Sequence, residues 1–234
     1  MALISSKNCP VGPSLIEALK YHDVSRVWLL PAALNALVEL SPDLGQCLPR
    51  LRFWVCTGDT LSPGLAAKLQ RAVPDARLFN LYGTSEVWDA TWYEVPATGV
   101  NGLFVPIGKA ISNVEVVVVD ENIRPGPRGT LGEIAISGTG LALGYLSRPS
   151  LGGKQSLTDL SGSGINGKGF YLTGDLGRFT ENGELVFLGR RESFVRRANH
   201  TINLIEIEAA LTLHPMVMES AVGSCRNDLD EIEL

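Results

Sequence analysis

Chemically versatile side chains are concentrated in the stretch Asn80-Leu81-Tyr82-Gly83-Thr84-Ser85-Glu86, which follows the apolar residues Leu78 and Phe79. The stretch supplies an amide, an aromatic ring, two hydroxyl groups and a carboxylate within seven residues. A ring can stack on a nucleotide base, hydroxyl groups can contact a phosphate, and a carboxylate can bind a hard cation such as Mg²⁺. Taken alone, the stretch fits a nucleotide site just beyond the end of a strand and an ordinary polar turn equally well.

Helices and strands are expected to alternate between residues 13 and 82. Apolar spacing predicts strands at 26–30, 51–56 and 77–82. Helices are predicted to begin at a capping box formed by Ser14 and Glu17, at Pro31, and at Ser62 with Pro63. This alternation predicts parallel strands joined by crossover helices, which is the pattern of an α/β core.

The pattern changes after Pro96. Strand-like segments at 114–120, 132–137 and 184–188 are separated by turns rich in Gly and Pro, which predicts a small, mostly-β unit. Residues 150–169 are rich in Gly and Ser and are interpreted as an exposed loop. An amphipathic helix is expected from Ile202 to Leu211, with Ile207, Ala210 and Leu211 facing inward.

The loop contains a segment, Gly162 to Gly169, that nearly matches a phosphate-binding P-loop. Gly169 stands where that motif needs a Mg²⁺-binding Ser or Thr, and no strand or helix is predicted around it. The segment is therefore interpreted as a flexible loop rather than a nucleotide site.

Composition narrows the classes of function. A net charge of −5 with scattered Lys and Arg argues against nucleic-acid binding. The four cysteines form no CxxC pair and, with three dispersed histidines, predict neither a disulfide framework nor a metal site of the Cys/His type. No signal peptide and no membrane-length apolar run is recognised, so a soluble cytoplasmic protein without membrane partners is expected.

Three further stretches are chemically distinctive: Gly132 to Tyr145, Tyr171 to Arg178, and Phe187 to Glu192 continuing into Ile202 to Glu208. With Asn80 to Glu86, and in this order, they resemble the core motifs of the adenylate-forming (AMP-binding) superfamily. The resemblance is greatest to the amino-acid adenylation domains of non-ribosomal peptide synthetases. It implies a partial parallel α/β adenylation core at residues 1–100, a β-rich subdomain at 101–191 and the start of a small α+β C-terminal lid at 192–234.

The resemblance also implies a chemistry. Such enzymes join a carboxylic acid to ATP with Mg²⁺ as cofactor, and pass the resulting acyl-adenylate to a thiol on a phosphopantetheine carrier domain or on coenzyme A. The amino group of adenine would bind Asn80, the ring of Tyr82 would stack on the base, and Gly58 and Gly83 would lie beside the nucleotide. Ser85 would contact the α-phosphate and Glu86 would hold Mg²⁺.

The second half of the resemblance supplies the ribose and hinge residues. Asp175 would accept both ribose hydroxyls, Arg190 would lie beside the ribose, and Glu192 would be the hinge about which the lid turns. No catalytic residue is assigned, since the family's phosphate-binding loop, substrate-binding aspartate and terminal lysine have no counterpart in residues 1–234. Asn199 and Thr201 replace the Gly and Arg expected near the hinge.

The chain is therefore interpreted as part of an adenylating enzyme that is inactive alone. The missing part of the sheet is expected to leave a strand edge unpaired and the helix face of Leu34, Leu37 and Val38 uncovered. Two alternatives stay open. One is an acyl-CoA synthetase for fatty or aryl acids, and the other is a non-catalytic fragment that binds nucleotide or a partner.

Overall fold

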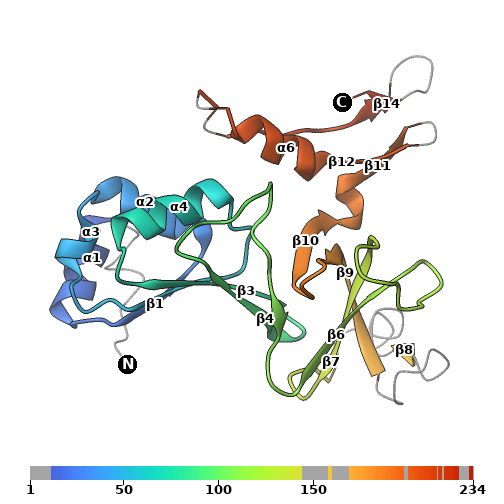
Figure 1. The fold of residues 1–234 in the computed structure, drawn as a ribbon, viewed down its shortest axis with the longest axis horizontal. Coiled ribbons are helices and arrows are strands. Elements are labelled where there is room, and N and C mark those ends of the chain that lie inside the picture. Colours follow the sequence, from blue (N-terminus) through green and yellow to red (C-terminus); the bar gives the residue numbers. More distant parts are fainter. Residues whose placement is uncertain are drawn as a thin grey trace. The chain divides into compact units, whose positions relative to one another are not determined.

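The computed structural model describes residues 12–143, 158–159, 169–197, 200–214, 216–217, 219–226 and 232–233. The chain divides into two compact units: Met1–Gly83 with Trp92–Val105, and Thr84–Thr91 with Pro106–Leu234 (Figure 1). Helices and strands are mixed in the pattern of an α/β protein, as predicted. None of the helices described is long and apolar enough to span a membrane.

A parallel sheet organises the first unit. Its strands are β1 (Arg26–Leu29), β2 (Phe53–Cys56) and β3 (Arg77–Thr84). In register, Arg26 lies opposite Phe53, and Phe53 lies opposite Arg77. The helices are α1 (Pro13–Tyr21), α2 (Pro31–Leu40), α3 (Leu44–Cys47) and α4 (Pro63–Ala72). The predicted alternation of parallel strands and crossover helices is confirmed, and β4 (Trp88–Val95) follows β3 in the sheet.

Two of the predicted helix starts are confirmed and one is wrong. Both α2 and α4 begin with proline, and Ser62 caps α4 by accepting a hydrogen bond from Leu65 N (3.2 Å). The predicted capping box of Ser14 does not form, because α1 already begins at Pro13 and its N-cap is Gly12. Proline suits the first helical position, so Ser14 falls inside the first turn and cannot cap it.

The helices of the first unit cover one face of the sheet (Figure 1). The core between them contains Leu34 and Leu37 of α2, Trp54 of β2 and Leu69 of α4, each fully buried. The prediction that the α2 face is uncovered is therefore wrong, since even Val38 is only 5% exposed. Helical periodicity identifies the apolar side of α2 correctly, but it cannot tell which layer of the molecule covers that side.

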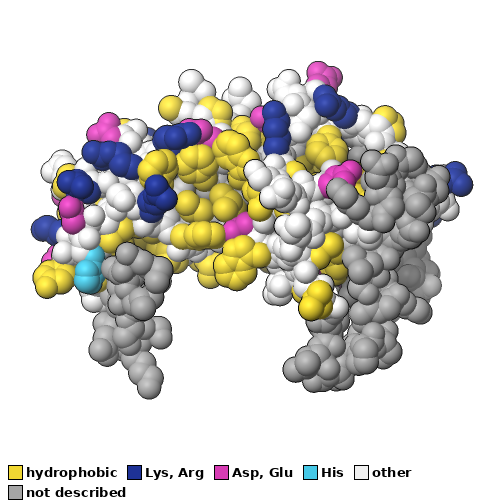
Figure 2. Space-filling model, turned by 90° about the horizontal axis from the view of Figure 1, so that it is seen from below, with side chains coloured by type: hydrophobic (Ala, Val, Ile, Leu, Met, Phe, Trp, Pro, Cys, Tyr) yellow, Lys and Arg dark blue, Asp and Glu magenta, His cyan; other side chains and the backbone are white. Residues whose placement is uncertain are grey.

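The uncovered apolar surface is on the opposite face of the sheet. Side chains alternate along a strand, so Trp28, Phe53 and Phe79 point away from the face that buries Trp54 and Leu78. Trp28 is 50% exposed and Trp92 of β4 is 44% exposed. Hydrophobic side chains gather on the side of the molecule seen in Figure 2. We call Trp28, Phe53, Phe79 and Trp92 the aromatic face.

The second unit is built on an antiparallel sheet, which confirms the predicted β-rich unit. The strand order is β10-β9-β7-β6, with β8 pairing with β9. The bounds are β6 (Val114–Val119), β7 (Gly132–Gly138), β8 (Thr158–Asp159), β9 (Gly169–Phe179) and β10 (Leu185–Arg190). The short strand β5 (Lys109–Ala110) precedes them. Of the P-loop-like segment, only Gly169 lies within the described residues, and it begins β9.

The end of the chain contains short elements. They are the 3₁₀ helix η2 (Arg191–Ser193), β11 (Phe194–Arg197), β12 (His200–Asn203), α6 (Leu204–Thr212), β13 (Cys225–Arg226) and β14 (Ile232–Glu233). The predicted start of the last helix at Ile202 is wrong, because Ile202 pairs with Val195 and Asn203 caps α6. The predicted inward face is wrong for Ala210 and Leu211, which are exposed, while Ile207 is half-buried and Leu204 is the buried residue of α6.

Candidate functional site

Asp175 is the one charged residue among the buried residues in the part of the chain that the structure describes. Its side chain is only 5% exposed and lies in β9, which pairs with β7 on one side and β10 on the other. A buried carboxylate is costly unless hydrogen bonds or opposite charges compensate the lost hydration. Contacts close to Asp175 must therefore offset the cost of burying its charge inside a strand.

A β-bulge positions Asp175. Glu133 pairs with Leu176 and Ala135 pairs with Leu172, so Ile134 alone lies opposite Thr173, Gly174 and Asp175. The pairing of β9 with β10 also shifts here, between Phe187 and Gly189. Bulges bend a strand and re-aim its side chains, and they are frequent beside functional sites.

Side-chain hydrogen bonds hold the bulge. The Thr173 hydroxyl donates to Ile134 O (2.8 Å) and accepts from Asp175 N (3.1 Å), so one buried hydroxyl links the two strands. Gly174 has φ 76°, a left-handed conformation that glycine adopts without strain. The sequence Thr-Gly-Asp thus supplies a hydroxyl, a flexible residue and a carboxylate in the order that the bulge needs.

Arg190 lies directly opposite Asp175 in the register of β9 and β10. Arg190 Nε is 3.4 Å from Asp175 Oδ1, and the arginine side chain is 68% exposed. The pair therefore joins a sheltered carboxylate to a cation that reaches solvent. The oxygens of this carboxylate can accept hydrogen bonds from the hydroxyl groups of a ligand.

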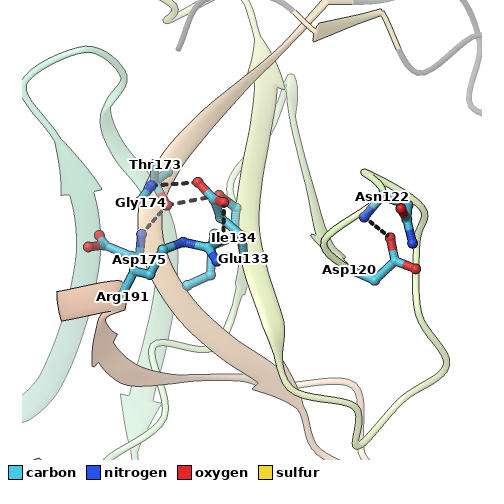
Figure 3. A network of polar contacts seen from close by, with 8 residues as sticks. All are labelled: Asp120, Asn122, Glu133, Ile134, Thr173, Gly174, Asp175 and Arg191. Carbon is cyan, nitrogen blue, oxygen red and sulfur yellow. Dashed lines mark hydrogen bonds and ion pairs between the residues drawn. The ribbon is translucent and has the colours of Figure 1, made fainter. Parts of the chain in front are cut away.

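Glu133 and Arg191 complete this part of the site, and the sequence motifs did not single them out. Glu133 Oε1 accepts a hydrogen bond from Gly174 N (2.9 Å), and Glu133 Oε2 accepts one from Arg191 Nη2 (2.7 Å). Figure 3 shows Glu133 lying beside Thr173 and Gly174, with the side chain of Arg191, the first residue of η2, reaching toward Glu133. A charged residue directly before the apolar run Ile134-Ala135-Ile136 was the available signal.

The stretch from Asn80 to Glu86 is less of a turn than the sequence suggested. Strand β3 continues to Thr84, so Asn80, Tyr82 and Gly83 lie in the strand, and the turn contains residues 85–87. Asn80 is buried opposite Cys56, and Tyr82 is half-buried on the same side of the strand. A polar residue and an aromatic ring thus share one strand face.

The following turn carries the other two predicted residues. Ser85 is exposed and Glu86 is half-buried. Glu86 N donates to Thr84 Oγ1 (3.3 Å) and Ala142 N donates to Glu86 O (2.7 Å), so the backbone of the turn is held on two sides. A single carboxylate suits Mg²⁺, which usually takes one or two protein oxygens and completes its octahedron with water and substrate phosphate. No group of three or more His, Cys, Asp or Glu side chains that could hold a metal ion occurs in the part of the chain that the structure describes.

Gly58 follows β2 with φ 83°, and a Cβ there would lie 2.7 Å from Leu30 Cδ2. Any other residue would be strained and would displace Leu30. Glu192, the predicted hinge residue, is exposed in η2. Asn199 lies outside the described residues, and Thr201 is exposed in β12.

The predicted residues thus fall into two groups. Gly58, Asn80, Tyr82 and Gly83 belong to the first unit, on β3 and the loop after β2. Ser85, Glu86, Asp175, Arg190 and Glu192 belong to the second unit. Within the second group, the structure brings Asp175 and Arg190 into contact and places Glu192 directly after them in η2.

Asp175 beside Arg190 is thus a buried carboxylate that could accept hydrogen bonds from the hydroxyl groups of a ligand. The family model of AMP-binding enzymes matches residues 2–146, more than half of the chain, so the protein belongs to that family. Malpinin synthetase of Mortierella alpina is 34% identical over 206 residues, which are 87% of this chain and 3% of the synthetase. A dimodular nonribosomal peptide synthase of Bacillus subtilis is 35% identical over 211 residues, which are 89% of this chain and 8% of that synthase.

A solved structure agrees with this assignment. A four-domain non-ribosomal peptide synthetase, holo-AB3403 bound to AMP and glycine, matches with a TM-score of 0.81 and 26% identity. The match covers 98% of this chain and 17% of the synthetase. The chain therefore spans a small part of each of these three synthetases, and the α/β fold predicted from its motifs is confirmed.

Proposed function

We propose that the chain is the nucleotide-binding part of an enzyme that activates an amino acid as its acyl-adenylate. The substrate carboxylate attacks the α-phosphorus of ATP, and the bond to pyrophosphate breaks. A thiol then attacks the acyl carbon, AMP leaves, and the thiol proton is released. The observation that carries the proposal is the buried Asp175 carboxylate, held by a bulge and paired with Arg190.

The ribose is the ligand group that Asp175 fits. A carboxylate has two oxygens and accepts hydrogen bonds only, which matches the two adjacent hydroxyl donors of a ribose. Arg190 Nε lies 3.4 Å from one of these oxygens, and the arginine side chain is 68% exposed. The synthetase with bound AMP and glycine supports this choice of nucleotide and of an amino-acid substrate.

The remaining roles are proposals of the same kind. Asn80 takes the adenine amino group, Tyr82 stacks on the base, and Gly58 and Gly83 let the backbone approach the nucleotide. Ser85 contacts the α-phosphate. Glu86 holds Mg²⁺, which would neutralise negative charge on the phosphates when bound.

The thiol step involves the end of the chain. We place the start of the lid at residue 192, after a core at 1–100 and a β-rich subdomain at 101–191, with Glu192 as hinge. The thiol belongs to a phosphopantetheine carrier domain or to coenzyme A. An ATP-consuming reaction of this kind fits the cytoplasm. Residues 1–234 alone are proposed not to complete the reaction, because no phosphate-binding Ser/Thr/Gly loop is found in them.

The test is pyrophosphate exchange into ATP, measured with a panel of amino acids, fatty acids and aryl acids. The protein is assayed both as residues 1–234 and within the longest open reading frame that contains them. Exchange that depends on an amino acid in the longer protein, but not in the shorter, is the expected result. Dependence on a fatty or aryl acid would favour an acyl-CoA synthetase. No exchange in either would contradict the enzymatic proposal.

A further inference from the structure

Glu133 links two parts of the site that are distant in the sequence. Its side chain is 13% exposed and its two oxygens have different partners. One oxygen accepts from Gly174 N, 41 residues away, and the other from Arg191 Nη2, 58 residues away. Gly174 directly precedes Asp175, and Arg191 begins the 3₁₀ helix that contains Glu192.

The bond to Gly174 fixes the direction of Asp175. In the bulge, the Gly174 N–H has no place in the regular ladder between β7 and β9, since the pairing shifts there. Glu133 supplies the acceptor that this donor needs. With Thr173 bonded to Asp175 N, the peptide groups on both sides of Gly174 are held. The rotation that a glycine would otherwise allow is thereby restricted.

The bond to Arg191 fixes the start of η2. Arg191 is 53% exposed, and its contact with the sheltered Glu133 carboxylate is a charge-assisted hydrogen bond, which is stronger than a neutral one. Arg190, one residue earlier, is held by Asp175. Arg190 therefore contacts Asp175, and Arg191 contacts Glu133. Both carboxylates lie beside the same bulge, so the segment that leads to Glu192 is attached there twice.

We propose that Glu133 is a positioning residue that couples the ribose-binding carboxylate Asp175 to the hinge segment Arg191–Ser193. It acts on the nucleotide through Gly174 and on the hinge through Arg191, without touching either ligand or lid. The inference rests on the proposed function, because it takes Asp175 as the ribose acceptor and Glu192 as the hinge.

The chemistry of a glutamine at this position makes the inference testable. Both partners of Glu133 are donors, and a carboxylate offers an acceptor to each. The isosteric amide offers one acceptor and one donor, so in Glu133→Gln one of the two contacts faces donor against donor. The matched control is Glu121→Gln, which removes the same charge from an exposed turn residue.

The experiment measures ribose discrimination by the full chain, as the ratio of the Kd for 2′,3′-dideoxy-ATP to the Kd for ATP. Hydrogen bonds to a charged acceptor predict a ratio of about ten or more for the wild type. Asp175→Ala is expected to bring the ratio to about one. Glu133→Gln is expected to lower it at least threefold, and Glu121→Gln to leave it unchanged. A loss of rigidity elsewhere would lower the melting temperature without changing this ratio.

Hydrogen exchange provides the second measurement. Glu133→Gln is expected to speed exchange at the Gly174 amide and across Arg191–Ser193, while Arg191→Met speeds it only across Arg191–Ser193. A wild type without ribose discrimination, or Asp175→Ala that keeps it, overturns the proposed function and this inference with it. Loss of discrimination in Asp175→Ala with full discrimination in Glu133→Gln overturns the inference alone. Unchanged exchange across Arg191–Ser193 in Glu133→Gln also overturns it.

Discussion

The rings of Phe79 and Trp92 lie 6.1 Å apart on the sheet face opposite the helices. Phe53 extends this row, 6.1 Å from Phe79, and the Arg77 guanidinium lies 5.0 Å from the centre of the Phe79 ring. Parallel sheets usually have both faces covered, and large exposed apolar patches are association sites. We therefore expect the chain to self-associate through the aromatic face rather than through the buried α2 face.

Replacing Trp92 with threonine is expected to reduce self-association of the purified chain. Threonine keeps the β propensity of the position but removes an indole that is 44% exposed. Sedimentation velocity over a range of protein concentrations measures the change. Tyr21→Ser is the control, because it removes an 85% exposed ring at the end of α1. Equal association of Trp92→Thr and the wild type would show that the aromatic face is not the contact surface.

Acid should weaken the pairing of β3 with β4. Arg77 donates from Nε and Nη2 to the two Glu94 oxygens, both at 2.6 Å, and these hydrogen bonds hold the pKa of Glu94 below its ordinary value of 4.5. A lowered folded-state pKa means that the stabilisation is present above the unfolded-state pKa and is lost as pH falls through the folded value. The effect is small, because both side chains are substantially exposed and solvent screens the pair.

Urea unfolding of the wild type and Glu94→Gln between pH 3 and 7 measures this contribution. The wild type is expected to be the more stable above the ordinary pKa of 4.5, and the difference should shrink as pH falls through the lowered pKa of Glu94. A difference that stays constant with pH would mean that the hydrogen bonds, rather than the charge of Glu94, account for it. Glu121→Gln again controls for the change in net charge.

The thiols should differ sharply in reactivity. Burial in β2, with a smaller contribution from Asp59, raises the pKa of Cys56 to about 12, whereas Cys225 is exposed. Because the thiolate is the nucleophile, Cys56 should resist alkylation at pH 8 until the first unit unfolds, while Cys225 reacts at once. Mass spectrometry of iodoacetamide-treated protein at increasing urea concentrations separates the two. Rapid labelling of Cys56 in native buffer would contradict the buried position.

The raised pKa of Cys56 also predicts that the free energy of unfolding falls between about pH 9 and 12.

Periodicity predicted β1, β2, β3 and the helices α1, α2 and α4 because their apolar spacing is local, but it did not predict the short helix α3 or strand β4. It missed β9, since Gly174 and Gly177 interrupt the alternation that marks a strand. The motifs identified Asp175 and Arg190 as site residues. That the two residues lie opposite each other could be learned only from the strand register of β9 and β10. Glu133 could not be paired with Gly174 and Arg191 from sequence, because the link depends on a bulge between distant segments.

Glu86→Gln is expected to abolish most of the Mg²⁺-dependent pyrophosphate exchange in the longer protein. The amide keeps the size of the side chain but loses the charge that a hard cation prefers. The turn should persist, since Glu86 N donates to Thr84 Oγ1 and Glu86 O accepts from Ala142 N, and both backbone hydrogen bonds remain in the variant. Exchange measured against Mg²⁺ concentration tests the role: a raised Mg²⁺ requirement supports it, and an unchanged titration contradicts it.

Asp175→Ala should weaken ATP binding by about 10- to 150-fold, because a lost hydrogen bond to a charged group costs about 1.5–3 kcal/mol. The fold should survive, since Arg190 is 68% exposed and can be hydrated once its partner is gone.

Asp120→Ala is the contrasting variant. Asp120 accepts from Asn122 N (2.8 Å) and Arg124 N (2.9 Å) in a turn away from the bulge (Figure 3). It should lower the melting temperature and leave the Kd for ATP unchanged. Calorimetric titration with ATP and thermal unfolding of both variants separate the roles: a lowered melting temperature with unchanged ATP binding in Asp175→Ala would make this carboxylate structural rather than ligand-binding.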